Sequence, residues 1–344
     1  MMKFTPRYQN SQHKQKGVAL VSVLLAIALC VILATEILTE QKFQVQRVQN
    51  ILERQQAYWY AISSENFVKA LLKRTAEKDK GVFNLDQPWA ISGMSFPVDD
   101  GLIEGEIKDL SSCFNLNSLY YPDIADDEKK ARLELFVRLL SNLDITAEVS
   151  HEDLAVNLFD WLDKDDYPSG AVGYDGDMYT GLAFPYLSAN SNLAHENELR
   201  VIYGFDVMVM TQLKDKVCVI PNNNQLQINV NTIDAENPEY LMAMLDIDRA
   251  KVDDILSNRP DDGFNDIAEF FALKEVSSLA NIAQLDKSQF TVNSNFFKLI
   301  TNAYFNDIKF DLTSVFQLDN NYNVNVITRR FGGRIERKAN PETE

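Results

Sequence analysis

One early stretch of the chain is strongly apolar. Val18–Ala34 contains no charged residue, and the apolar pattern continues to Leu38. About 20 residues at roughly 1.5 Å each span the hydrocarbon core of a bilayer as a helix. The preceding residues are polar, and their basic members include Arg7, Lys14 and Lys16. Because basic flanks stay in the cytoplasm, the pattern predicts a single transmembrane helix over 18–38, with the rest of the chain exported.

The helical pattern continues beyond the apolar run. No Gly or Pro interrupts the chain from Val18 to Lys80, and apolar residues recur every three to four positions. We expect one helix from Val18 to about Arg74, whose outer half packs an apolar face on a domain. The residues predicted for this face are Val45, Val48, Ile51, Leu52, Trp59, Ile62, Phe67, Leu71 and Leu72.

Strand patterns occur in two separated parts of the chain. Apolar and polar residues alternate around Ile103 and Ile107, which indicates a strand over 101–110. The predicted strands are 90–96, 101–110, 298–304, 314–318 and 324–330. Asp319-Asn320-Asn321 predicts a hairpin turn between the last two. The fold class is therefore α+β, an antiparallel sheet split in sequence by a large helical insertion.

A long helix that leads into a small sheet resembles a pilin subunit. The resulting domain plan is a leader (1–17), a transmembrane helix (18–38), the first part of a pilin-like domain (39–124), an inserted all-α domain (125–288), C-terminal strands (289–336) and a polar tail (337–344).

Gly17 lies immediately before the apolar run. Secretory signals are cut after the run at a small-x-small site, and Leu33-Ala34-Thr35-Glu36 fits such a site poorly. Lys16-Gly17-Val18 instead resembles the leader of type IV prepilins, which is cut before the helix. This predicts cleavage between Gly17 and Val18. An uncleaved signal anchor explains the same tripeptide equally well.

Two phrases in the insertion echo each other. We call 114–119 (FNLNSL) and 228–233 (INVNTI) the echo segments; each precedes helical patterns, such as 128–143 and 238–245, so the insertion reads as two related helical units. The second unit resembles a helix-hairpin-helix domain around 259–264. DNA-binding versions carry glycines in a hairpin that holds phosphate, whereas this chain carries Asp246 and Asp248 there. Together with a net charge of −17, this argues against nucleic acid as a partner.

Acidic residues concentrate between Asp160 and Asp177. Calcium takes six to eight oxygen ligands, which closely spaced carboxylates on a Gly-containing loop can supply. Counting from Asp163, the sixth position is Pro168 rather than the Gly of an EF-hand, so any site is irregular. The alternative is a solvated acidic loop. The candidate calcium ligands are Asp163, Asp165, Asp175, Asp177, Asn190 and Glu198.

The cysteines predict a disulfide, and two common catalytic motifs are absent from the sequence. Two of the three cysteines, Cys113 and Cys218, lie outside the apolar run, and in an oxidising compartment they form the one possible pair. The alternative is two buried thiols. The sequence has no G-x-S-x-G elbow and no phosphate-binding G-x-x-x-x-G-K-[ST] loop, so we expect no enzyme. A membrane-tethered hydrolase that uses two carboxylates is a weaker alternative.

Several ordered motifs together resemble the K family of minor pseudopilins of the bacterial type II secretion system. They are 16–20 (KGVAL), 113–117 (CFNLN), 160–163 (DWLD), 190–193 (NSNL), 198–200 (ELR) and 229–232 (NVNT). The resemblance runs from about Gly17 to Arg334. The run 172–177 departs from the family's usual loop, which leaves the exact ligands open.

The resemblance implies a pilin-like domain interrupted by a helical domain, structural calcium in the acidic loop, and a place at the pseudopilus tip. The implied partners are the I and J minor pseudopilins, then H and the major pseudopilin G, together with the prepilin peptidase and the inner membrane. It also implies a methylated N-terminus and a C-terminal domain in the periplasm.

Ser22 is the fifth residue after the predicted cut. Most pilin-like subunits have Glu there, which pairs with a neighbouring subunit. An unpaired carboxylate at this depth costs roughly 2.5 to 3.5 kcal/mol, so a subunit with no neighbour above it is better without one. Ser22 therefore marks a tip subunit if cleavage occurs. The competing hypothesis is a membrane-anchored periplasmic helix-hairpin-helix binding module, for which Ser22 has no meaning.

Overall fold

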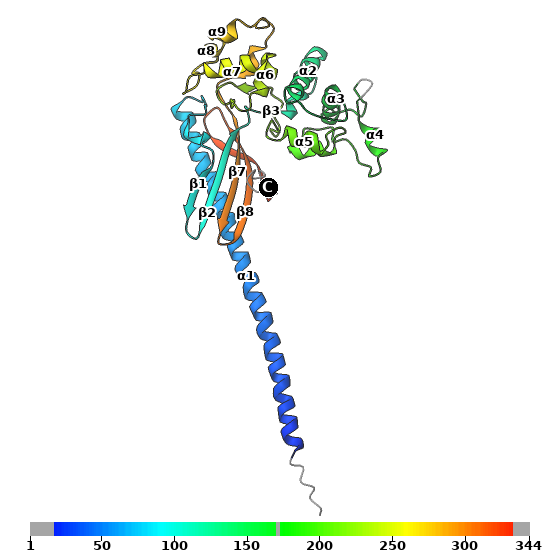
Figure 1. Ribbon diagram of the computed structural model, residues 1–344, viewed down its shortest axis with the longest axis vertical. Coiled ribbons are helices and arrows are strands. Elements are labelled where there is room, and N and C mark those ends of the chain that lie inside the picture. The colour runs from blue at the N-terminus through cyan, green and yellow to red at the C-terminus, as the bar shows by residue number, and fades with distance from the viewer. Residues whose placement is uncertain (1–16, 170–172, 333–344) are drawn as a thin grey trace, which may run out of the picture. The chain divides into compact units, whose positions relative to one another are not determined.

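The computed structural model describes residues 17–169 and 173–332. The chain divides into two compact units at the boundary between Gln56 and Ala57. Both units contain part of α1, which is one continuous helix over Val18–Lys78 (Figure 1). This confirms the predicted long helix. Its N-terminal part is long and apolar enough to cross a membrane, as a single-pass anchor requires.

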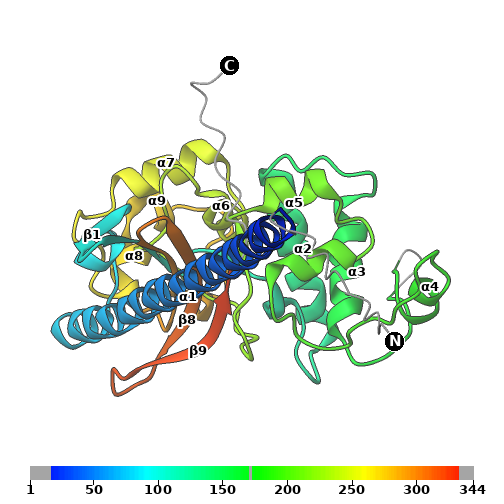
Figure 2. The same ribbon diagram turned by 90° about the horizontal axis from the view of Figure 1, so that it is seen from below.

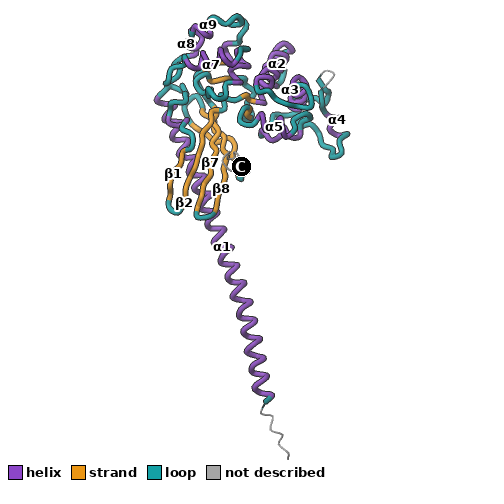
Figure 3. The backbone as a smooth tube through the Cα atoms, in the orientation of Figure 1, coloured by secondary structure: helices purple, strands orange, loops and turns teal. Residues whose placement is uncertain are grey.

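The second unit is built on an antiparallel sheet. Its described strands pair in the order β1-β2-β7-β8-β9 (Figure 3). Their bounds are β1 (Met94–Val98), β2 (Gly101–Asp109), β7 (Phe296–Phe305), β8 (Ile308–Leu318) and β9 (Val324–Phe331). The hairpin predicted at Asp319 is present, since Asp319 N–H donates to the Asn323 carbonyl oxygen at 3.0 Å. The first strand does not begin at Ala90, because Pro88–Ala90 forms the 3-10 turn η1.

The C-terminal part of α1 packs on this sheet through small residues. The buried positions are Ala57, Ala61, Glu65, Val68, Leu72, Thr75 and Ala76. The predicted apolar face was wrong in part: Leu72 is buried and Ile62 and Leu71 pack against the core, but Trp59 and Phe67 are 50% and 48% exposed. Alanines at Ala57, Ala61 and Ala76 let the helix backbone approach the strands, which bulkier side chains would prevent.

The insertion joins two neighbouring strands. The chain leaves the sheet after β2 and returns at β7, and these strands pair with Asp109 opposite Phe297. Its helices form two groups in Figures 1 and 2, α2–α5 and α6–α9. The first group contains η2 (Leu116–Leu119), α2 (Asp126–Asn142), α3 (His151–Leu162), α4 (Gly176–Thr180), η3 (Glu196–Val201) and α5 (Val207–Leu213). The second contains α6 (Glu239–Leu245), α7 (Arg249–Ser257), α8 (Ile267–Ala272), α9 (Lys274–Ser277) and η4 (Lys287–Gln289).

Both echo segments play the same structural part. The first two residues of each segment form a short strand, which pairs in parallel with a strand at the end of the same helical group. In the first group β3 (Phe114–Asn115) pairs with β4 (Val217–Cys218). In the second group β5 (Ile228–Asn229) pairs with β6 (Phe290–Thr291).

A second asparagine in each segment then binds a distant backbone. The Asn117 amide exchanges two hydrogen bonds with Leu193, at 3.0 and 2.8 Å. The Asn231 amide does the same with Phe264, at 2.9 and 2.8 Å. The two helical groups, which the echo segments predicted to be related in sequence, therefore also share this hydrogen-bonding arrangement.

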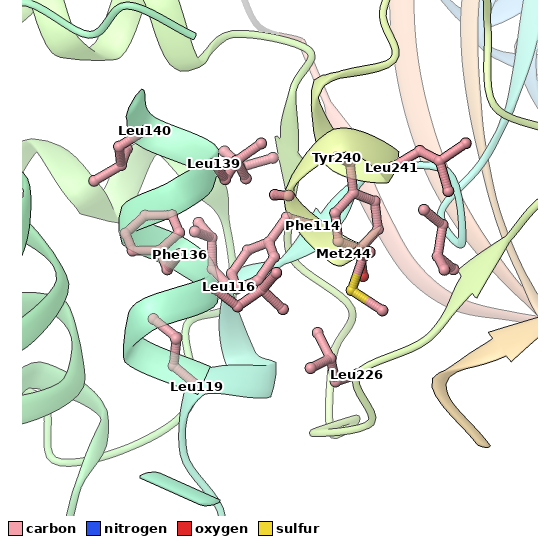
Figure 4. Packing of buried hydrophobic residues seen from close by; sticks show 14 of the residues in the cluster. Phe114, Leu116, Leu119, Phe136, Leu139, Leu140, Leu226, Tyr240, Leu241 and Met244 are labelled. Carbon is pink, nitrogen blue, oxygen red and sulfur yellow. The ribbon is translucent and has the colours of Figure 1, made fainter. Parts of the chain in front are cut away.

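Aromatic packing joins the two helical groups. Phe114 stacks on Phe136 of α2, with ring centroids 5.1 Å apart, and its edge meets Tyr240 of α6 at 5.8 Å (Figure 4). All three side chains are buried. One continuous core thus fixes both groups of the insertion relative to each other.

A disulfide closes the insertion near the sheet. Cys113 and Cys218 are joined, with an S–S distance of 2.08 Å and a Cα–Cα distance of 5.8 Å. They lie in a small cluster with Leu110, Ile220 and Phe296, where the insertion meets β7. The predicted pairing is confirmed.

Candidate functional site

The acidic loop begins where α3 ends. Ser150 caps the start of α3 through a reciprocal capping box with Asp153. The apolar face of α3 lies in the core of the insertion, with Leu158 fully buried. Because this face fixes the last turn, Asp160 is fully buried and Asp163 is only 6% exposed. Both carboxylates are therefore held at the start of the loop, away from solvent.

Three carboxylates converge from the two ends of the loop. One oxygen each of Asp163, Asp165 and Asp175 lies within 4.8 Å of the others. Asp163 and Asp175 are buried and Asp165 is exposed. Three buried oxygens in this region have no hydrogen-bond partner: Asp160 Oδ1, Asp163 Oδ1 and Asp175 Oδ2. Buried acceptors in proteins are normally satisfied by a hydrogen bond, an ordered water or an ion, so these oxygens are candidate ligand atoms.

The electrostatics of the cluster also favour a bound cation. Burial raises the pKa of Asp163 to about 7, helped by the charges of Asp165, Asp160 and Asp175. Burial also raises the pKa of Asp160, although hydrogen bonds from Ser169 oppose that rise. Negative groups held together away from water are costly unless a cation accompanies them. Oxygen donors alone are the ligand set of hard divalent cations, so these residues fit calcium.

The remaining predicted ligands lie in different surroundings. Asn190 Nδ2 donates to Asp166 Oδ1 at 2.8 Å, and Asn190 Oδ1 is buried without a partner. Glu198 Oε1 accepts the backbone N–H groups of Ala194 and His195 at 2.9 Å, which completes the cap of η3. The side chain of Asp177 lies outside the described residues. The membership of Asn190, Glu198 and Asp177 in a metal site stays a prediction.

Asp160 was not among the candidate ligands of the sequence interpretation, but it is fully buried next to the cluster. Its signal was its spacing, because residues three apart on a helix share one face and Asp163 follows Asp160 at that distance. Gly173 is required beside it: a Cβ at Gly173 would lie 2.3 Å from Asp160 Oδ2 and 2.7 Å from the Ser169 backbone nitrogen. The glycine thus lets the loop close over the buried carboxylate.

The helix-hairpin-helix turn shows no free phosphate cradle. Asp246 ends α6 in the left-handed conformation, with φ at 53°. Asp248 caps α7 through its own carboxylate, which accepts the Lys251 N–H at 3.0 Å. A carboxylate therefore already lies at the helix N-terminus where a phosphate would bind.

In the apolar part of α1, the hydroxyl of Ser22 makes a hydrogen bond within the helix. Ser22 Oγ donates to the Ala19 carbonyl oxygen at 2.9 Å, which suits an apolar environment. Gly17 directly precedes α1, so the predicted cut leaves the whole helix on the mature chain. The leader residues 1–16 lie outside the described residues.

Comparisons with known proteins now decide the family. Sequence models for type II secretion system protein K match residues 112–222 and 228–293, each of which covers one helical group and its echo segment. Type II secretion system protein K of Aeromonas hydrophila is 33% identical over 95% of this chain and 99% of its own length. The chain belongs to the type II secretion system protein K family.

Other members of the family agree. Protein K of Pectobacterium carotovorum is 31% identical over 95% of this chain and 99% of its own. Among solved structures, GspK in the GspK-GspI-GspJ complex of enterotoxigenic Escherichia coli matches with a TM-score of 0.73 and 29% identity. That match covers 83% of this chain and 99% of the other. The protein is thus a minor pseudopilin of type II secretion with the predicted α+β fold, and nothing in these comparisons favours the helix-hairpin-helix binding module.

Proposed function

We propose that this minor pseudopilin sits at the tip of the pseudopilus, where it initiates or caps assembly in complex with the I and J minor pseudopilins. The observation that carries the proposal is the match to GspK from a complex that contains GspI and GspJ, which covers 83% of this chain and 99% of that one. The insertion adds two helical groups between β2 and β7, bulk that would obstruct a further subunit above it. We expect the chain to contact H and the major pseudopilin G below the tip.

The proposal also places the chain in the cell. The prepilin peptidase removes the leader between Gly17 and Val18, and the new N-terminus is methylated. The helix from Val18 anchors the protein in the inner membrane by a single pass, and the sheet and insertion lie in the periplasm. The Cys113–Cys218 disulfide supports this location, because disulfides persist in oxidising compartments. The role is assembly rather than catalysis.

A ternary complex tests the tip proposal. The full-length chain, coexpressed with the I and J pseudopilins of the same organism and purified in detergent, should elute with both at one copy each. The chain alone should form no filament. Failure of either partner to copurify, while I and J still bind each other, would overturn the proposed assembly.

We further propose that calcium binds in the acidic loop. Asp163, Asp165 and Asp175 would hold it, with the orphaned Asp160 Oδ1 beside them. The ion would supply the positive charge that these buried oxygens lack and would hold the two ends of the loop together.

Melting curves test the calcium proposal. Binding to the folded state alone stabilises by RT ln(1 + [L]/Kd), so calcium at about 100 times Kd adds about 2.7 kcal/mol. The full-length protein should melt several degrees higher in calcium than in chelator. Asp175→Asn should remove most of this difference. Identical curves for the wild type in the two conditions would contradict a structural calcium ion.

A further inference from the structure

A lysine from another helix reaches the acidic loop. Lys129 lies on α2, and its Nζ donates to Ser169 Oγ at 3.0 Å. The same ammonium lies 3.8 Å from the centroid of the Phe159 ring, a cation–π distance. Ser169 in turn donates its backbone N–H to Asp160 Oδ2 at 2.9 Å. One residue thus separates the ammonium from the buried carboxylate.

The contacts of Lys129 hold its charge in place. Lysine normally keeps its flexible side chain in water, and fixing it costs rotamer entropy. Here the ring of Phe159 supports the ammonium on one side and Ser169 binds it on another. Ser169 binds both the ammonium and Asp160 Oδ2, so the positive charge lies close to the buried carboxylate. Lys129 is therefore a fixed cation, separated from the buried carboxylate of Asp160 by Ser169 alone.

We propose that Lys129 sets the calcium affinity of the acidic loop by acting as its built-in counter-charge. Without calcium, the ammonium partly balances Asp160 and Asp163 and keeps the loop folded. With calcium bound, the two cations repel each other, so Lys129 weakens binding and makes it reversible. The inference rests on the proposed calcium site and adds what tunes it.

The chain offers a matched control at the next residue. Lys130 lies on the same helix, but its Nζ is 3.8 Å from Glu134 Oε1 and its side chain is 75% exposed. Lys129→Met and Lys130→Met therefore remove the same charge from the same helix, and only the first removes it from the loop. Lys129→Arg keeps the charge and tests whether packing alone matters.

Calorimetric calcium titration of full-length protein in detergent measures the effect. Lys129→Met should lower the calcium Kd roughly 3- to 10-fold, the range that one nearby charge produces. Lys130→Met and Lys129→Arg should stay within about twofold of the wild type on the same grounds. In chelator, Lys129→Met should melt below both the wild type and Lys130→Met. The variant should thus gain more from calcium while being less stable without it.

The outcomes separate the two proposals. If the wild type binds calcium and Lys129→Met binds it equally or more weakly, the role of Lys129 is overturned while the calcium site stands. An equal gain in affinity for Lys130→Met also overturns it, because the effect would then be general charge. If the wild type takes up no calcium, the calcium site itself fails, and the role of Lys129 fails with it.

Discussion

Glu65 is the most deeply buried acid of the helix–sheet contact, with 1% of its surface exposed. It lies on α1 and accepts hydrogen bonds from Arg329 on β9 at 2.8 to 3.0 Å and from Ser314 on β8 at 2.5 Å. The side chain of Arg329 is 43% exposed, so the two partners differ in their access to water. The pair fixes β9 against the helix at the open edge of the described sheet.

The difference in exposure between Glu65 and Arg329 predicts that the two residues tolerate substitution differently. Arg329→Ala leaves the Glu65 carboxylate buried without its cation and should cost about 3 kcal/mol or more of unfolding free energy. Glu65→Gln leaves an arginine that water can reach and should cost less, about 1 to 2 kcal/mol. Denaturant unfolding at fixed calcium concentration measures both. Equal losses, or a larger loss for Glu65→Gln, would show that burial does not govern the pair.

At the scale of elements, the α6–α7 hairpin shows how two aspartates in one turn differ. Asp246 adopts a left-handed conformation that glycine adopts without strain. It also lies 3.7 Å from Arg138, but both side chains are well exposed, so that ion pair contributes little. Asp248 caps α7 by accepting the Lys251 N–H. One position is strained and the other is stabilising.

Substitutions at these two positions should therefore differ in their effect on stability. Asp246→Gly should be neutral or stabilise the protein by up to about 1 kcal/mol, since it removes the conformational strain. Asp248→Ala should destabilise it by about 1 kcal/mol, because it removes the cap. Asp248→Gly serves as a control with a loss of only a few tenths. Thermal unfolding of the three variants compares them, and destabilisation by Asp246→Gly would contradict the argument.

At the scale of the whole molecule, the proposed tip position involves both the apolar part of α1 and the insertion. Ser22 satisfies its hydroxyl inside the helix and brings no charge into the bilayer. A tip subunit with this residue needs no partner above it in the membrane. The insertion, in turn, is joined to the sheet through β2 and β7, and the Cys113–Cys218 disulfide closes it near β7.

Restoring the charge should disturb the tip. Ser22→Glu should reduce crosslinking to I and J, or shift the protein toward the major pseudopilin, because a buried carboxylate needs a partner that the tip lacks. Mass analysis should show cleavage between Gly17 and Val18 in both proteins. Ser22→Ala is the neutral control and should assemble normally. Wild-type protein distributed along the whole filament at high copy number would rule out the tip position.

The sequence alone determined the features that depend on local pattern. An uncharged run, a helical period without Gly or Pro, alternating strand residues and the turn at Asp319 are properties of neighbouring residues, and all appear in the structure. The two echo segments revealed the two helical groups for the same reason. Counting fixed which cysteines could pair, since only Cys113 and Cys218 lie outside the apolar run, and the structure shows that they are bonded.

Tertiary structure decided everything that depends on residues far apart in the chain. The face of α1 that packs on the sheet includes three alanines and Glu65, which carry little periodic apolar signal beside Trp59 and Phe67. The Glu65–Arg329 pair joins residues 264 positions apart. Asp163 and Asp175 come together from the two ends of the acidic loop, and Lys129 reaches that loop at Ser169 from another helix. Local sequence pattern specifies the helices and strands. The burial of side chains and the convergence of distant carboxylates arise only when these elements pack, and both are needed to form the candidate site.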